Sequence, residues 1–175
     1  MPKGILFKNI GLYLICARVL TYYGIEVCPF LDQIDVYDLI TEMVVGLGLV
    51  HAIKLVWCRY LPEREGPDLG PPWRFLTIEL ATWVAGGIGI TIWNAWMYDF
   101  PVESGLKVIL GTSTLGVFSA TFLALDIERE TILRLSAMPH AEPVDTSRFL
   151  SITTKFMAFV GSSIVLLAIV IVLLI

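Results

Sequence analysis

The chain has 175 residues, of which 57% are hydrophobic, and its mean hydropathy is +0.79. An average soluble domain is only about 45–50% apolar, and a single core of this size cannot hide the excess from water. Composition therefore excludes an ordinary soluble domain and indicates a chain whose main solvent is a lipid bilayer. The formal net charge of −4 is uninformative in itself, because membrane helices are oriented by the positions of their basic residues.

Five apolar stretches, each about as long as one crossing of the hydrocarbon core, follow one another along the chain. The first, residues 5–24, is interrupted by Lys8 and Arg18 and ends at a pair of tyrosines. The second, residues 34–57, is largely apolar, with Glu42, His51 and Lys54 embedded in it. Both stretches are long enough to span a membrane as helices.

The next two stretches carry fewer charges. Residues 75–98 contain one acid, Glu79, and are flanked by tryptophans that resemble the aromatic belts at membrane interfaces. Residues 105–125 contain a single charge, Lys107, and end where a run of charged residues begins at Asp126. Each of these stretches predicts one further transmembrane helix.

The fifth stretch, residues 156–175, has no charge, proline or amide side chain and is the clearest membrane-spanning segment. The sequence therefore predicts an all-α, polytopic membrane helical bundle with about five transmembrane helices. Residues 126–138 mix apolar and charged side chains, so they either prolong the fourth helix into the cytoplasm or lie along the membrane surface. We expect a four-helix membrane bundle at residues 1–125, a cytoplasmic connector at 126–149 and the fifth helix at 150–175.

The basic residues predict how the helices are oriented. Ten of the twelve Lys and Arg residues lie near the N-terminus or near the connections that follow the second and fourth stretches. The other two connections, residues 25–33 and 99–104, contain acidic residues but no Lys or Arg. Because basic residues favour the cytoplasmic side, we expect a bacterial inner-membrane protein with a cytoplasmic N-terminus. An odd number of crossings then places Ile175 in the periplasm, either as the end of the protein or as a point from which a longer chain continues.

Two sets of ionisable side chains lie inside the predicted membrane region, where burying a charge costs roughly 2.5 kcal/mol or more. At about 1.5 Å per residue, Arg18 and Glu42 fall at the same depth in the outer half of the bilayer. They either form an intramembrane charge pair, or Arg18 extends to the outer headgroups while Glu42 lines a small polar pocket.

His51 and Glu79 fall at similar depths in the cytoplasmic half, with Lys54 and Lys8 nearer the surface. A histidine beside a carboxylate is suited to a proton-responsive site or to contact with a quinone or pigment. His51 and Glu79 are therefore the candidate cofactor-binding residues, although a single histidine near a helix end more often makes a structural hydrogen bond. The sequence itself requires no cofactor.

Small residues repeat every four positions along the third and fourth stretches. Such stripes allow the backbones of membrane helices to approach closely. They indicate either that the third helix packs against the fourth or that they contact another membrane protein, including a second copy of this chain. The predicted packing residues are Ala81, Ala85, Gly89, Gly116, Ala120 and Ala124.

The sequence contains no recognisable catalytic constellation. It lacks the glycine-rich phosphate loops, the G-x-S-x-G nucleophile motif and the H-E-x-x-H zinc motif. Its three cysteines have neither metal-ligand nor CxxC spacing. We therefore expect no enzyme activity, no metal site and no nucleic-acid partner, and we expect contact with membrane lipids and with a protein in the membrane.

Two segments resemble a known group of proteins. In residues 150–175, the run Ser-Ile-Thr-Thr-Lys-Phe leads directly into an unbroken apolar stretch. This segment resembles the first transmembrane helix of bacterial transducers with HAMP linkers, such as adenylate or guanylate cyclases and chemoreceptors. Residues 103–130, which end in Leu-Ala-Leu-Asp-Ile-Glu-Arg-Glu, are similar to the end of the multi-helix membrane regions that precede such modules. The resemblance implies an outer sensing domain, a return helix, a HAMP linker and a cytoplasmic output domain beyond residue 175.

The leading interpretation is a non-catalytic membrane-anchoring and sensory region of a larger bacterial signal transducer. An alternative from another class is a small accessory subunit of a respiratory or photosynthetic membrane complex, which stabilises the assembly and binds lipid, quinone or pigment. A proton-coupled transporter that uses Arg18, Glu42 and Glu79 is a weaker hypothesis, because the chain lacks the internal repeat found in many transporters.

Overall fold

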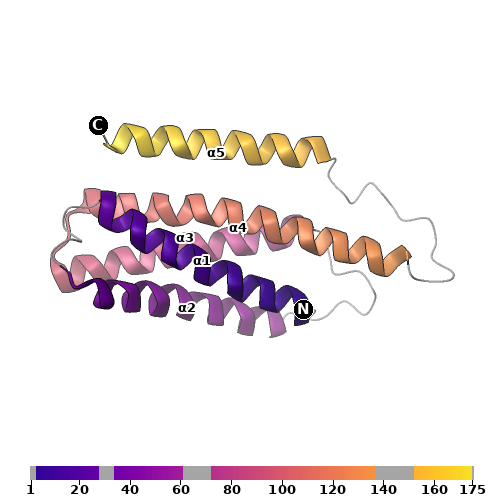
Figure 1. The fold of residues 1–175 in the computed structure, drawn as a ribbon, viewed down its shortest axis with the longest axis horizontal. Helices are drawn as coiled ribbons and strands as arrows, with labels where there is room; N and C mark the ends of the chain where they lie inside the picture. The colour runs from indigo at the N-terminus through magenta and orange to yellow at the C-terminus, as the bar shows by residue number, and fades with distance from the viewer. Residues whose placement is uncertain (1–2, 28–33, 61–71, 137–151, 175) are drawn as a thin grey trace.

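The computed structural model describes residues 3–27, 34–60, 72–136 and 152–174, which form five helices. The predicted all-α helical fold is therefore confirmed (Figure 1). The bounds of the helices are α1 Lys3–Val27, α2 Val36–Tyr60, α3 Pro72–Tyr98, α4 Val102–Ser136 and α5 Ile152–Leu174.

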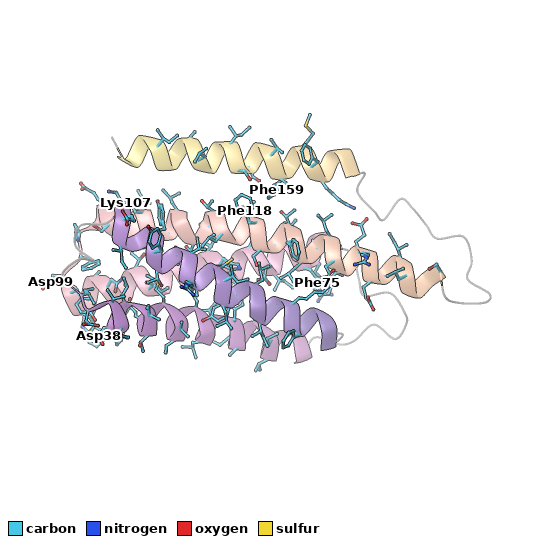
Figure 2. The ribbon with its side chains drawn as sticks, in the orientation of Figure 1. Asp38, Phe75, Asp99, Lys107, Phe118 and Phe159 are labelled. Atoms are coloured by element: carbon cyan, nitrogen blue, oxygen red, sulfur yellow. The ribbon has the colours of Figure 1, made fainter. Side chains whose placement is uncertain are left out.

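The helices lie along one common long axis and alternate in direction (Figure 1). Helices α1, α3 and α5 run away from the end of the bundle that holds the N-terminus, here called the N-terminal end, and α2 and α4 run back toward it. Helices α1 to α4 pack together as a bundle, whereas α5 lies along its outside against α4. The rings of Phe118 and Phe159 meet between α4 and α5, with centroids 4.9 Å apart (Figure 2).

Three helices have the length and apolar composition of a membrane crossing within the part of the chain that the structure describes. They cover Val36–Val56, Arg74–Tyr98 and Val102–Leu133. Large apolar side chains such as Ile15, Leu49 and Phe122 are exposed on the outside of the bundle, as expected for side chains that face lipid. The crossing of α1 and α5, and so the number of crossings, stays a prediction.

The ends of the helices show why the chain turns where it does. Asp35 caps α2, because its Oδ1 accepts a hydrogen bond from the backbone N–H of Tyr37 at 2.7 Å. Pro72 begins α3, at a position where the missing backbone donor costs nothing. Asp99, with a φ of 52°, ends α3 in the left-handed conformation that stops helices. Figure 2 places Asp38 and Asp99 together at the end opposite the N-terminal end.

Helix α4 continues without a break through residue 125, where the sequence placed the boundary of the bundle, and ends at Ser136. Its continuation stays packed against the bundle, because Leu123 and Ile127 are buried beside Phe75 of α3. The first part of the predicted connector therefore prolongs the fourth helix, one of the two alternatives left open. The rest of the connector and the Pro/Gly-rich residues 66–71 lie outside the described residues.

The predicted packing stripe on α4 is buried, and it faces α3. Gly116, Ala120 and Ala124 are all buried. A Cβ atom built on Gly116 would lie 2.6 Å from the Cβ of Trp83 on α3. This close approach requires glycine, so the fourth stretch was assigned to the correct face.

The predicted stripe on α3 does not pack against α4, so of the two alternatives only contact with another membrane protein stays open for it. Ala81, Ala85 and Gly89 are exposed, and a Cβ atom on Gly89 would meet nothing within 4 Å. The close contacts of α3 are made by Gly87 against Thr112 of α4 and by Gly86 against Leu47 of α2. The exposed stripe and the contacting glycines lie on different sides of the same helix, and a four-residue repeat does not identify the side that faces the bundle.

Candidate functional site

The carboxylate of Glu79 is the centre of a buried polar cluster inside the four-helix bundle. Glu79 is 4% exposed and lies about 10 Å along α3 from its first residue. Its Oε1 accepts hydrogen bonds from the indole Nε1 of Trp83 at 3.1 Å and from the hydroxyl of Ser119 at 3.4 Å. Its Oε2 accepts from the Lys54 ammonium at 2.5 Å. Both oxygens are therefore used in contacts with protein groups.

Lys54 extends the cluster to the remaining helix. Its Nζ donates to Oδ1 of Asn9 on α1 at 3.5 Å as well as to Glu79. Lys54 and Asn9 are both buried, so neither group is hydrated in the usual way. The residues Asn9, His51, Lys54, Glu79, Trp83 and Ser119 are called the Glu79 cluster below, and they join α1, α2, α3 and α4.

His51 lies between two aromatic rings at the edge of the cluster. Its ring centroid is 4.8 Å from that of Tyr13 and 5.1 Å from that of Trp83. Its Nδ1 lies 3.1 Å from the carbonyl oxygen of Leu47, and because a carbonyl only accepts, Nδ1 carries the hydrogen. The atom that faces Glu79, at 3.4 Å from Oε1, is Nε2, which makes no hydrogen bond of normal geometry.

The charges and hydrogen bonds of the Glu79 cluster favour a role in holding the four helices together over a role in ligand binding. Lys54 and Glu79 carry opposite charges, and the pair is surrounded by polar donors and acceptors that offset part of its desolvation. His51 and Glu79 lie side by side, as their similar predicted depths indicated. Because protein groups occupy both oxygens of Glu79, the geometry favours the structural role that was left open for His51.

The predicted pair of Arg18 and Glu42 is not formed. Arg18 is exposed on α1, whereas both carboxylate oxygens of Glu42 are buried and have no hydrogen-bond partner among the described residues. The two residues share a depth but lie at different angles around their helices. The arrangement agrees with the other alternative, in which Arg18 points outward and Glu42 lines a polar pocket.

Several members of these polar sites were not predicted from the sequence. Lys54 was expected nearer the surface than Glu79, and Asn9, Ser119 and Asn94 were not expected as site residues. Asn94 is 1% exposed on α3. The available signal was an amide side chain within an apolar stretch, since polar groups between membrane helices commonly form hydrogen bonds across them.

Two ion pairs join other helices to α4 near the N-terminal end. Lys8 of α1 lies 2.8 Å from Asp126, and Lys155 of α5 pairs with Glu128. The Lys155–Glu128 pair is mostly buried, whereas Lys8 is about half exposed, and exposed pairs contribute only about 0–1 kcal/mol. Within the described residues, no group of three potential metal ligands occurs.

These features define a helical membrane domain whose described polar residues form attachments between its helices. The MASE10 family model matches residues 12–175. The chain therefore belongs to the MASE10 family, and it is a membrane sensory domain of the type found in cyclic di-GMP signalling proteins.

One curated relative supports this assignment. A cyclic di-GMP phosphodiesterase of Vibrio cholerae serotype O1 is 23% identical over 126 residues, which are 71% of this chain and 24% of that protein. The match thus covers only about a quarter of the relative's length. No solved structure matches the chain.

The comparisons confirm the leading functional interpretation at the level of a membrane sensory region. They give no support to an accessory subunit of a respiratory or photosynthetic complex. The resemblance to signal transducers is confirmed in general terms, but the relative is a cyclic di-GMP phosphodiesterase rather than a nucleotide cyclase or chemoreceptor.

Proposed function

We propose that this chain is the inner-membrane sensory region of a larger bacterial protein whose cytoplasmic output module controls cyclic di-GMP. The family match over residues 12–175 is the observation that carries the proposal. The relative that acts on cyclic di-GMP is about four times as long as the matched segment, which leaves room for an output module outside a region of this kind.

The Glu79 cluster is the proposed coupling element. Glu79 contacts Ser119 on α4, and Lys54 contacts Asn9 on α1, so a shift of any helix changes contacts in the others. Helix α4 continues from Ser119 to Ser136, beyond the predicted cytoplasmic surface. A rearrangement at the cluster would therefore be carried along α4 out of the membrane.

The proposed orientation has a consequence for the whole protein. With a cytoplasmic N-terminus and five crossings, α5 runs toward the periplasm, so a cytoplasmic output module that follows α5 requires at least one further crossing. A return helix followed by a HAMP linker, as in the transducers that the sequence resembles, meets this requirement.

Cyclic di-GMP in cells tests the proposal. The full-length protein would be expressed in a host whose own cyclic di-GMP enzymes have been deleted, and the nucleotide would be measured by mass spectrometry. We expect the protein to change the cyclic di-GMP level, and we expect Glu79→Gln to alter that level about two- to thirtyfold relative to wild type at equal protein abundance.

The matched control is Lys107→Gln, which changes a half-buried charge on α4 outside the Glu79 cluster. It should leave the cyclic di-GMP level close to that of wild type. A full-length protein without effect on cyclic di-GMP would overturn the proposed function. An effect that Glu79→Gln leaves unchanged would overturn the coupling role of the cluster.

A further inference from the structure

A second polar site lies between α2 and α3, far from the Glu79 cluster. Asn94 is 1% exposed, and neither polar atom of its side chain has a hydrogen-bond partner among the described residues. Both carboxylate oxygens of Glu42 are buried in the same unpartnered state. The Asn94 side chain faces the Glu42 carboxylate, but no hydrogen bond of normal geometry joins them.

The packing of the two helices separates this site from the Glu79 cluster. A Cβ atom on Gly46 would lie 3.2 Å from Ile90, so these residues meet about one turn from Glu42 and Asn94 along the antiparallel helices. Buried Met43 and Leu47 continue the apolar contact toward the N-terminal end. Glu42 and Lys54 are about 18 Å apart along α2. The two carboxylates therefore belong to separate sites.

An unpaired carboxylate in this position needs a positive charge. Removing a carboxylate from water is expensive unless a cation or several hydrogen bonds compensate it. At Glu79, the chain supplies Lys54 and two hydrogen-bond donors. At Glu42, no described residue supplies either an ion pair or a hydrogen bond.

The ionisable groups of the neighbouring helices leave this requirement unmet. On α1, Arg18 and Tyr22 are exposed, and Tyr23 packs against Gly111 of α4. On α3, Tyr98 packs against Phe100 beyond the end of the helix. On α2 itself, Asp38 adds a negative charge about one turn away. On α4, the half-buried Lys107 makes no hydrogen bond to Glu42, whose two oxygens are without a partner among the described residues. The described groups therefore do not provide the compensating charge.

We propose that Glu42 and Asn94 form a binding site for one small monovalent cation, either a proton or a sodium ion. The two oxygens of Glu42 and Oδ1 of Asn94 are the three acceptors of the site. A proton would make Glu42 a neutral acid that donates to Oδ1 and accepts from the Nδ2 amide of Asn94. A sodium ion would be held by the same oxygens with water completing its coordination. A single carboxylate balances one positive charge, so the site fits a monovalent ion.

Thermal unfolding of the full chain in lipid nanodiscs tests this site, independently of the proposed signalling function. In one arm, the sodium concentration would be raised at constant pH. Sodium would replace N-methylglucamine, so that the ionic strength stays constant. In the other arm, pH would be lowered without sodium. Binding to the folded state raises the unfolding temperature, and we expect a rise of about 5 °C at 100 times the dissociation constant in the effective arm.

Three variants make the result specific. Glu42→Gln should fold at least as well as wild type, because it removes the buried charge, and it should lose the dependence on the effective cation. Asn94→Ala should weaken the dependence. Glu103→Gln, a change of an exposed acid at the start of α4, should keep it.

Each outcome decides the proposal. A dependence on sodium that Glu42→Gln abolishes identifies sodium as the ligand, and a dependence on pH that the same variant abolishes identifies the proton. A wild-type protein that responds to neither, or a response that persists in Glu42→Gln, overturns the site.

Discussion

The Nζ of Lys54 lies 2.5 Å from Oε2 of Glu79, and the side chain of each residue is only 6% exposed. Lys54→Met would leave the Glu79 carboxylate buried without its cation, which should lower the free energy of unfolding by about 3–5 kcal/mol. The double variant Lys54→Met/Glu79→Gln should lose much less free energy of unfolding, because no buried charge remains unpaired. Unfolding in mixed micelles at increasing SDS, followed by tryptophan fluorescence, measures both variants.

Lys107→Met serves as the control for this comparison, since it removes a lysine outside the Glu79 cluster. It should change the free energy of unfolding little. A double variant as unstable as Lys54→Met alone would show that the charge pair is not what the lysine contributes.

Depth along a helix was predictable at the residue scale, but rotation around the helix was not. His51 and Glu79 meet as expected, because antiparallel helices of constant rise place residues of equal depth side by side. Arg18 and Glu42 also lie at equal depth but do not meet, because Arg18 lies on an exposed face of α1 together with Leu14 and Tyr22. The ion pair between Lys54 and Glu79 was not predicted, because the depth of the Lys54 backbone does not determine where the end of its long side chain lies.

At the element scale, the contact between α3 and α4 depends on Gly87. A Cβ atom there would overlap Thr112 Oγ1 and lie 3.2 Å from the Ile109 backbone, and Thr112 is fully buried and hydrogen-bonded to Val108. Gly87→Ala should therefore lower the free energy of unfolding by about 1–3 kcal/mol, as expected for overpacking. The same SDS unfolding assay measures the change.

Gly89→Ala is the matched control on the same helix. A Cβ atom at Gly89 would meet nothing within 4 Å, and alanine favours a helix over glycine by up to about 1 kcal/mol. This variant should be as stable as wild type or slightly more stable. Equal destabilisation by both substitutions would contradict the assignment of the α3 face.

The positions of the helices were largely predictable from the sequence, whereas their contacting faces were only partly predictable. Apolar length located all five helices. The stripe that contains Gly116 was assigned correctly, but Ala85 was chosen over Gly87, which lies about 160° away around the same helix. Both sides of α3 carry small residues, so the choice depends on contacts with α2 and α4 that a single sequence does not contain.

At the scale of the whole molecule, the charge pattern predicts which end of the bundle faces the cytoplasm. Alkaline phosphatase fused within residues 25–33 or 99–104 should be active, because it folds only after export, and fusion within residues 137–149 should be inactive. Green fluorescent protein at the same positions should give the opposite pattern. Phosphatase activity at residues 137–149 would contradict the assigned orientation.

The length of α4 has a mechanical consequence. With 35 residues, it is about 50 Å long, whereas the hydrocarbon core is about 30 Å thick. A tilt of about 5° that pivots at Ser119 displaces the backbone at Ser136, about 25 Å away, by about 2 Å sideways. Because helix tilt responds to hydrophobic mismatch, we expect a change in bilayer thickness to move the Ser136 end of α4 sideways.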